Sequence, residues 1–145
     1  MEIYTIGFTQ KTANEFFSRL RDAGIRRLLD IRLNNTSQLA GFAKRDDLEY
    51  FLSELCGAKY EHEPLLAPTP ELFKAYKREN GLWEDFEKGY RALIVERRID
   101  QAFDRNSFEA PTVLLCSEHV ADFCHRRLVV EYLREKWGGI EIVHL

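Results

Sequence analysis

The stretch Thr112-Val113-Leu114-Leu115 is the most apolar strand-like segment of the chain, and it runs directly into Cys116. Asp122 is placed to cap a helix whose apolar spacing continues to Trp137. Gly138-Gly139 then ends this helix, and residues 140–143 have the composition of a further strand. The last third of the chain therefore predicts a strand–helix–strand unit.

The same alternation of short strands and amphipathic helices fills the rest of the chain. Further strands are predicted at residues 2–6, 27–33 and 59–63, each followed by a helical pattern. Strands that are joined through helices run parallel, and the helices cover the sheet faces. The sequence therefore predicts a single α/β domain over residues 1–145. We expect a three-layer sandwich with a roughly five-stranded, mainly parallel sheet and helices on both faces.

Composition and charge exclude several classes of protein. Of the 145 residues, 45% are hydrophobic and 31% are charged, which argues against disorder and against a coiled coil. The chain has 21 Lys and Arg against 24 Asp and Glu, a net charge of −3, so binding to nucleic acid is possible but not favoured by charge. No apolar run reaches the roughly 18 residues that a membrane span needs, and no export signal is visible. We therefore expect a cytoplasmic protein without a membrane partner.

Polar and reactive side chains follow the predicted strands at their carboxyl ends. In open parallel sheets, ligands bind beyond these ends, where the strand order reverses. The candidate site residues gathered there are Thr9, Asp30, Arg32, Ser37, Cys116, Glu118, Cys124, His125 and Arg126.

The cysteines leave three interpretations open. Cys124 at a helix N-terminus beside Arg126 would be stabilised as a thiolate, so Cys124 or Cys116 is a candidate nucleophile. A metal site would need Cys124 and His125 to face one ion, yet neighbours on a helix point about 100° apart unless the helix begins at Cys124. No metal is therefore expected. Simple packing of small buried side chains is the third interpretation.

Two arginines indicate an anion site. Arg32 follows the second predicted strand and Arg126 opens the last helix, so both are expected to face the same crevice. The hydroxyls of Thr9 and Ser37 would add hydrogen bonds to a bound phosphate or carboxylate. The alternative is an internal lattice of salt bridges in which Asp30 pairs with Arg126 and Glu118 pairs with Arg32.

Three ordered motifs resemble family 488 of the domains of unknown function. They are Tyr4-Thr5-Ile6-Gly7, then Asp30-Ile31-Arg32 with Ser37, then Leu114-Leu115-Cys116-Ser117-Glu118 with Cys124-His125-Arg126. The resemblance covers nearly the whole chain and implies no particular activity. Many members resemble Gly-His-Ser after the first strand, where this chain has Gly7-Phe8-Thr9, so no histidine role is carried over there. Many also have proline before the loop serine, where this chain has Asn35-Thr36-Ser37.

The function expected from these residues is enzymatic, on a small substrate that carries phosphate or carboxylate. Glu118 or Asp30 is the candidate for the general acid or base, Cys116 or Cys124 for the nucleophile, and Arg32 with Arg126 for the charge clamp. His125 is a further candidate catalytic residue without an assigned role. One alternative is a non-catalytic module that binds a nucleotide or a nucleic-acid end. Another is a metal-binding regulatory domain. The sequence does not indicate which cofactor, if any, the protein uses.

Overall fold

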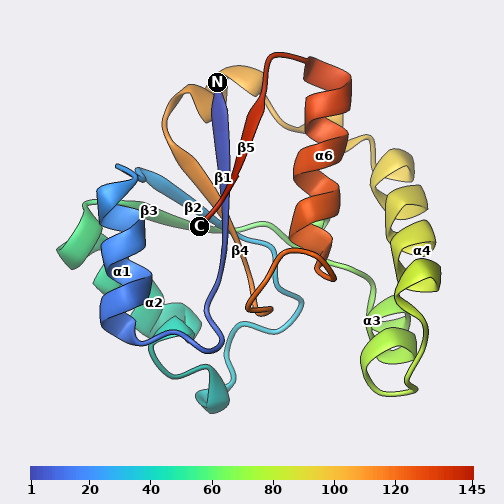
Figure 1. Cartoon of the computed structure of the whole chain (residues 1–145), viewed down its shortest axis with the longest axis horizontal. Coiled ribbons are helices and arrows are strands. Elements are labelled where there is room, and N and C mark those ends of the chain that lie inside the picture. The colour runs from blue at the N-terminus through green and yellow to red at the C-terminus, as the bar shows by residue number, and fades with distance from the viewer.

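Five parallel strands form one sheet at the centre of the molecule, in the computed structural model that describes residues 1–145 (Figure 1). The strands are β1 (Glu2–Gly7), β2 (Arg27–Asp30), β3 (Lys59–His62), β4 (Thr112–Cys116) and β5 (Glu141–His144). Their order is β3-β2-β4-β1-β5, and every neighbouring pair is parallel. The predicted five-stranded parallel sheet is confirmed.

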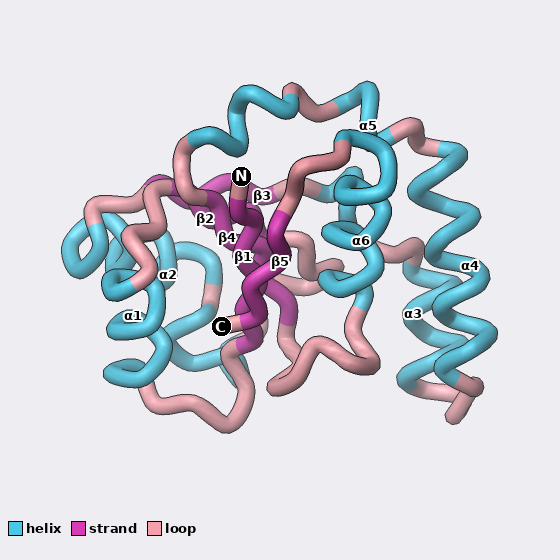
Figure 2. The backbone as a smooth tube through the Cα atoms, turned by 45° about the horizontal axis from the view of Figure 1, so that its top comes forward, coloured by secondary structure: helices cyan, strands magenta, loops and turns pink.

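Helices cover both faces of this sheet (Figure 2). On one face lie α1 (Ala13–Asp22) and α2 (Arg45–Phe51), and on the other lies α6 (His125–Trp137). The remaining helices α3 (Pro70–Lys77), α4 (Trp83–Glu96) and α5 (Ile99–Ala102) extend the second layer, with α4 packed on α6 and α3 packed on α4. The predicted α/β sandwich is confirmed, with the α3–α4 hairpin as an addition to its outer side.

The alternation of side chains along β4 divides the core in two. Leu114 and Cys116 join the apolar cluster under α4 and α6, whereas Val113 and Leu115 join the cluster under α1 and α2. All five residues of β4 are buried. Full burial of a leucine side chain contributes roughly 2 kcal/mol, so the central strand of the sheet is also a main source of stability.

Local side-chain caps start two of the helices, α1 and α3. The Thr12 hydroxyl accepts a hydrogen bond from the amide of Glu15 at the start of α1, and Thr69 caps α3 ahead of Pro70 in the same way. Short irregular turns complete the chain: 3₁₀ turns at Gln38–Ala43, Pro64–Leu66 and Arg105–Glu109, and a π turn at Leu52–Cys56.

Two predicted boundaries were wrong, and both shape the functional site. Helix α6 begins at His125 with Cys124 as its N-cap residue, so the exposed Asp122 is not the cap. Strand β2 ends at Asp30 rather than at Leu33, because the Asp30 carboxylate accepts hydrogen bonds from the backbone and the side chain of Arg32 and turns the chain out of the sheet.

No helix of the structure combines the length and the apolar character that a membrane crossing requires.

Candidate functional site

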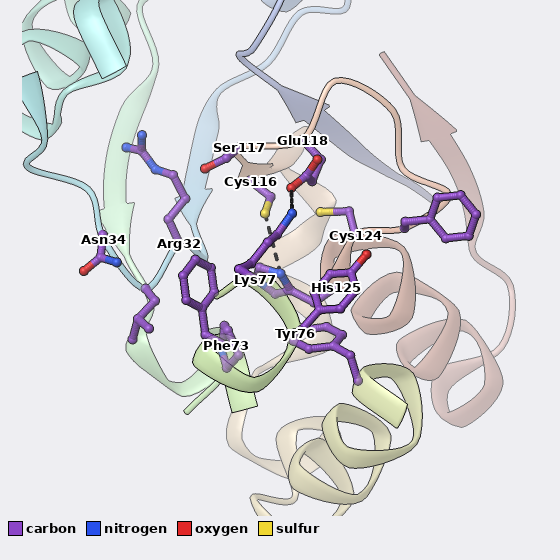
Figure 3. Close-up of a pocket in the computed structure, with 14 residues that line it drawn as sticks. Arg32, Asn34, Phe73, Tyr76, Lys77, Cys116, Ser117, Glu118, Cys124 and His125 are labelled. Carbon is purple, nitrogen blue, oxygen red and sulfur yellow. Dashed lines mark hydrogen bonds and ion pairs between the residues drawn. The ribbon is translucent and has the colours of Figure 1, made fainter. Parts of the chain in front are cut away.

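A cavity of about 120 Å³ opens at the carboxyl ends of β2 and β4 (Figure 3). One water needs only about 10–15 Å³ of such space, so the cavity can hold a small organic group. Its apolar wall is formed by Leu33, Pro68, Phe73, Tyr76, Phe86 and Phe123, and its polar wall by Arg32, Asn34, Lys77, Cys116, Ser117, Glu118, Cys124 and His125.

The position of the cavity follows from the order of the strands. After β2 the chain turns to α2 on one face of the sheet, and after the neighbouring β4 it turns to α6 on the other face. Two adjacent parallel strands that send the chain to opposite faces leave an opening between their carboxyl ends. The cavity therefore lies where the alternation of strands and helices predicted a crevice.

Cys116 and His125 form a close pair on the polar wall. The Sγ atom of Cys116 lies 3.5 Å from Nδ1 of His125, and Nε2 of His125 lies 2.9 Å from the carbonyl oxygen of Ile31. A carbonyl oxygen can only accept a hydrogen bond, so Nε2 carries a hydrogen and donates it to Ile31. Nδ1 is thereby left as the nitrogen that exchanges a proton with the Cys116 thiol.

Cys124 brings a second sulfur atom to this pair. As the N-cap residue of α6 it is extended, with φ −137° and ψ 140°, so its side chain turns back toward the end of β4. The two sulfur atoms and a ring nitrogen of His125 all lie within 4.8 Å of one another, and all three residues are buried. The cavity wall thus carries a compact cluster of two thiols and one imidazole.

The environment separates the acidities of the two thiols. A hydrogen bond from the Cys124 thiol, together with the charge of His125, brings the pKa of Cys116 well below its ordinary value despite burial. Burial and the same hydrogen bond raise the pKa of Cys124 well above its ordinary value. Burial alone would lower the pKa of His125, but the neighbouring Cys116 thiolate outweighs it and raises that pKa. These shifts favour a thiolate at Cys116 beside an imidazolium at His125, with the proton held more strongly by Cys124.

The cluster also has the donor types that a thiophilic cation contacts, two sulfurs and one imidazole nitrogen. Cys124 and His125 are not both inside the helix, because Cys124 is extended and only His125 has helical geometry. The separation of about 100° that was expected to keep them from sharing one ion therefore does not apply.

Asp30, Arg32 and Tyr60 form a buried network beside the cavity. The Asp30 carboxylate accepts hydrogen bonds from Nε and Nη2 of Arg32, both at 2.8 Å, and from the Tyr60 hydroxyl at 2.5 Å. Asp30 is fully buried and does not line the cavity. Burial and the hydrogen bond to Asp30 raise the pKa of Tyr60. The guanidinium of Arg32 turns toward this network and away from the sulfur atoms, so only the rest of its side chain faces the cavity (Figure 3).

Arg126 has a different role from the one predicted. It is 1% exposed, and its Nη1 donates to the carbonyl oxygen of Glu118 at 2.6 Å and its Nη2 to that of His119 at 3.4 Å. It does not line the cavity that Arg32 lines. The arginine clamp is therefore not formed, because Arg126 follows His125 by one residue and so points about 100° further around the helix. The Asp30–Arg126 pair of the alternative interpretation is not formed either, since Asp30 pairs with Arg32.

Thr9 and Ser37 also serve the backbone rather than the cavity. The Thr9 hydroxyl donates to the carbonyl oxygen of Ser117 at 2.7 Å, and the Ser37 hydroxyl accepts from the amide of Leu39 at 3.2 Å. Neither residue lines the cavity. Their hydroxyls hold loops at the carboxyl end of the sheet in shape.

Lys77 is the site residue that sequence reasoning missed. It lies at the end of α3 and forms an ion pair with Glu118, the residue that was expected to pair with Arg32. Burial alone would lower the pKa of Lys77, but the hydrogen bond to Glu118 raises it. The side chains of Lys77 and Glu118 are each 38% exposed, so the pair lies at the mouth of the cavity. No local signal in α3 marks this lysine, because only the docking of the α3–α4 hairpin brings it to the sheet.

The comparison with protein families agrees with two of the three motifs. The family described as Domain of unknown function DUF488 matches residues 12–133 of this chain. The chain belongs to the DUF488 family. In this DUF488 protein, the matched range contains the Asp30-Ile31-Arg32 motif and the block from Leu114 to Arg126, which supplies both sulfur atoms and the imidazole of the cluster. No match was found among curated proteins or among solved structures.

Proposed function

We propose that this DUF488 protein is an enzyme whose nucleophile is the thiolate of Cys116 and whose substrate is a small molecule with a phosphate or carboxylate group. The observation that carries the proposal is the pairing of Cys116 with His125 at the wall of a cavity. A thiolate, rather than a thiol, is the reactive form of cysteine, and an adjacent imidazolium stabilises it. The hydrogen bond from Nε2 to Ile31 holds the ring in the orientation that this pairing needs.

His125 is the acid–base group of the proposed mechanism. When the sulfur forms its bond to an electrophilic atom of the substrate, Nδ1 of the imidazolium can give its proton to the leaving group. Neither of the carboxylates expected in this role is placed as well. Asp30 is shielded behind Arg32, and Glu118 is engaged with Lys77.

Lys77 takes the anion-binding role that the arginines were expected to fill. Arg32 pairs with Asp30 and Arg126 binds backbone carbonyl oxygens, although each keeps one buried nitrogen without a partner. Lys77 lies at the mouth of the cavity with a single, partly exposed partner. An anionic group of a substrate can compete with Glu118 for Lys77, because an exposed ion pair is worth less than about 1 kcal/mol. The aromatic side chains of Phe73 and Tyr76 would enclose the remainder of the substrate.

We assign the protein to the cytoplasm as part of the same proposal. All three cysteines are free thiols, and two of them lie close enough to interact. A reducing compartment keeps such thiols available for chemistry.

Alkylation with two reagents of different charge tests the proposal. Iodoacetamide is neutral and iodoacetate is anionic. Both alkylate a thiolate by forming a bond between its sulfur and the CH2 carbon of the reagent, with release of iodide. We expect Cys116 to react at neutral pH about tenfold faster than Cys56, the matched internal control, when modified peptides are quantified by mass spectrometry. The rate ratio of iodoacetate to iodoacetamide at Cys116 should fall in Lys77→Gln and rise in Glu118→Gln, which frees the lysine.

Two outcomes would overturn the proposal. Equal rates at Cys116 and Cys56 would remove the activated nucleophile. A charge preference that is the same in wild type, Lys77→Gln and Glu118→Gln would remove the anion site at the mouth.

A further inference from the structure

The second thiol of the cluster is not used by the proposed function. Cys124 is 2% exposed, yet its sulfur is within 4.8 Å of both the Cys116 sulfur and a ring nitrogen of His125. Cys56, the third cysteine, is remote from this cluster and donates a weak hydrogen bond to the carbonyl oxygen of Phe17. The placement of Cys124 is therefore specific to the cavity.

We propose that Cys116 and Cys124 act together in thiol–disulfide exchange, and that the substrate class is small disulfides bearing a carboxylate. This inference rests on the proposed function, since it keeps Cys116 as the nucleophile and Lys77 as the anion-binding group. It adds the chemical class of the substrate and a role for Cys124 as the resolving thiol.

The first step uses the thiolate and the imidazolium that already face each other. The Cys116 sulfur attacks one sulfur of the substrate R–S–S–R′, forms a mixed disulfide with the R–S half and expels R′–S⁻. The expelled thiolate takes the proton from Nδ1 of His125 and leaves as R′–SH. His125 is then neutral, and its Nδ1 faces the two sulfur atoms as a proton acceptor.

The second step uses Cys124. Its thiol gives a proton to Nδ1 of His125, and the resulting thiolate attacks the Cys116 sulfur and expels R–S⁻, which takes that proton and leaves as R–SH. Two protein thiols have been oxidised to one disulfide, and one substrate disulfide has been reduced to two thiols, so protons and electrons balance. A dithiol reductant reduces the Cys116–Cys124 disulfide back to two thiols and completes the cycle.

The geometry suits this order of events. A resolving thiol must be unreactive toward the first substrate and close to the mixed disulfide. Burial and the raised pKa of Cys124 give the first property, and its sulfur lying within 4.8 Å of the Cys116 sulfur gives the second. Cys124 is the N-cap residue of α6, directly after the loop from Ser117 to Phe123, so its side chain can turn toward Cys116 without disturbing the helix. The two sulfur atoms lie within 4.8 Å of each other, and a disulfide bond brings them to about 2.05 Å.

The test uses two disulfides of similar length and opposite charge, 3,3′-dithiodipropionate and cystamine. Each is added to the reduced protein, and the products are read by intact mass and by peptide mapping. We expect the wild type to lose two hydrogen atoms and to gain a Cys116–Cys124 disulfide without a lasting adduct. Cys124→Ser should accumulate one adduct on Cys116, Cys116→Ser should form neither product, and the control Cys56→Ser should behave as the wild type.

The results separate the two proposals. A lasting adduct on Cys116 in the wild type would overturn the role of Cys124 and leave the nucleophile intact. Equal reaction of Cys116→Ser and wild type, or no reaction of the wild type with either reagent, would overturn disulfides as the substrate class, and the alkylation rate of Cys116 relative to Cys56 then decides whether the nucleophile stands. Faster reaction with cystamine than with 3,3′-dithiodipropionate would overturn the carboxylate preference. Peptide mapping of the wild type needs no variant, so the test holds even where a substitution prevents folding.

Discussion

Gly7 packs so tightly against Glu118 that a Cβ atom on residue 7 would lie 1.5 Å from the Glu118 carbonyl oxygen. The same carbonyl accepts the hydrogen bond from Arg126, and Gly7 is the register partner of Cys116 in the sheet. The end of β1 therefore presses on the loop that begins directly after the proposed nucleophile. This contact explains in physical terms why the first motif of the chain ends in glycine.

Gly7→Ala should destabilise the protein by about 2–3 kcal/mol, because the new methyl group meets backbone that cannot move without breaking the Arg126 hydrogen bond. Urea unfolding followed by circular dichroism measures the change. Gly24→Ala is the control, since its Cβ would meet nothing within 4 Å and only its φ of 69° is unfavourable, at about 1 kcal/mol. A loss at Gly7 no larger than at Gly24 would contradict the packing argument.

Asp30→Asn should cost about 3–5 kcal/mol, because it leaves the buried Arg32 without its charge partner. Thermal unfolding should show this loss with and without about 10 mM phosphate, since the Arg32 guanidinium faces away from the cavity and cannot recover an anion there. The double variant Asp30→Leu with Arg32→Met should regain part of the stability, because it removes both buried charges. Rescue of the single variant by phosphate would instead place Arg32 in an anion site.

Arg126→Met should lower the free energy of unfolding by about 1–3 kcal/mol, because the Glu118 carbonyl oxygen loses the donor that satisfies it. The neighbouring Arg127→Met should change it by less than about 1 kcal/mol, since the Arg127 ion pairs with Glu87 and Glu131 are only partly buried. We also expect Arg126→Met to leave the iodoacetate to iodoacetamide ratio at Cys116 unchanged. A fall in that ratio as large as in Lys77→Gln would restore Arg126 to the anion site.

The rate of Cys116 alkylation should persist to lower pH than the rate at Cys56. The thiolate is the reacting species, and its fraction at a given pH grows as the pKa falls. The hydrogen bond from Cys124 and the charge of His125 lower the pKa of Cys116, whereas burial raises the pKa of Cys56. The reactivity of Cys56 should therefore disappear first as the pH is lowered.

His125→Gln should move the Cys116 profile to higher pH, because the imidazolium no longer stabilises the thiolate. Rates from pH 5 to 10 with iodoacetamide, read on the separate Cys116 and Cys56 peptides, measure both effects. Profiles for the two cysteines that coincide, or a Cys116 profile that the substitution leaves in place, would argue against the thiolate–imidazolium pair.

Much of the fold was readable from local patterns. The apolar run at 112–115 forms the central strand, and the Thr12 and Thr69 hydroxyls cap α1 and α3 through hydrogen bonds to residues three positions on. These features depend on neighbours a few residues apart, through the period of the strand, the period of the helix and one hydrogen bond at a cap. The location of the cavity was also predictable, because parallel strands joined by helices place their carboxyl ends together.

The partners of the charged side chains were decided by the tertiary structure alone. Arg32 pairs with Asp30, two residues away, and Arg126 binds backbone carbonyl oxygens. Lys77 lies on α3, and nothing in the sequence places that helix beside the site. Spacing along the chain identifies the face on which a long side chain starts, but not the acceptor that it reaches across several ångströms. The start of α6 is a similar case, since Asp122 and Cys124 both precede a helical pattern and only the packing against β4 selects Cys124. The sequence thus determined which residues follow the strands at the carboxyl end of the sheet, and packing between distant segments determined which of them line the cavity and which atoms face each other.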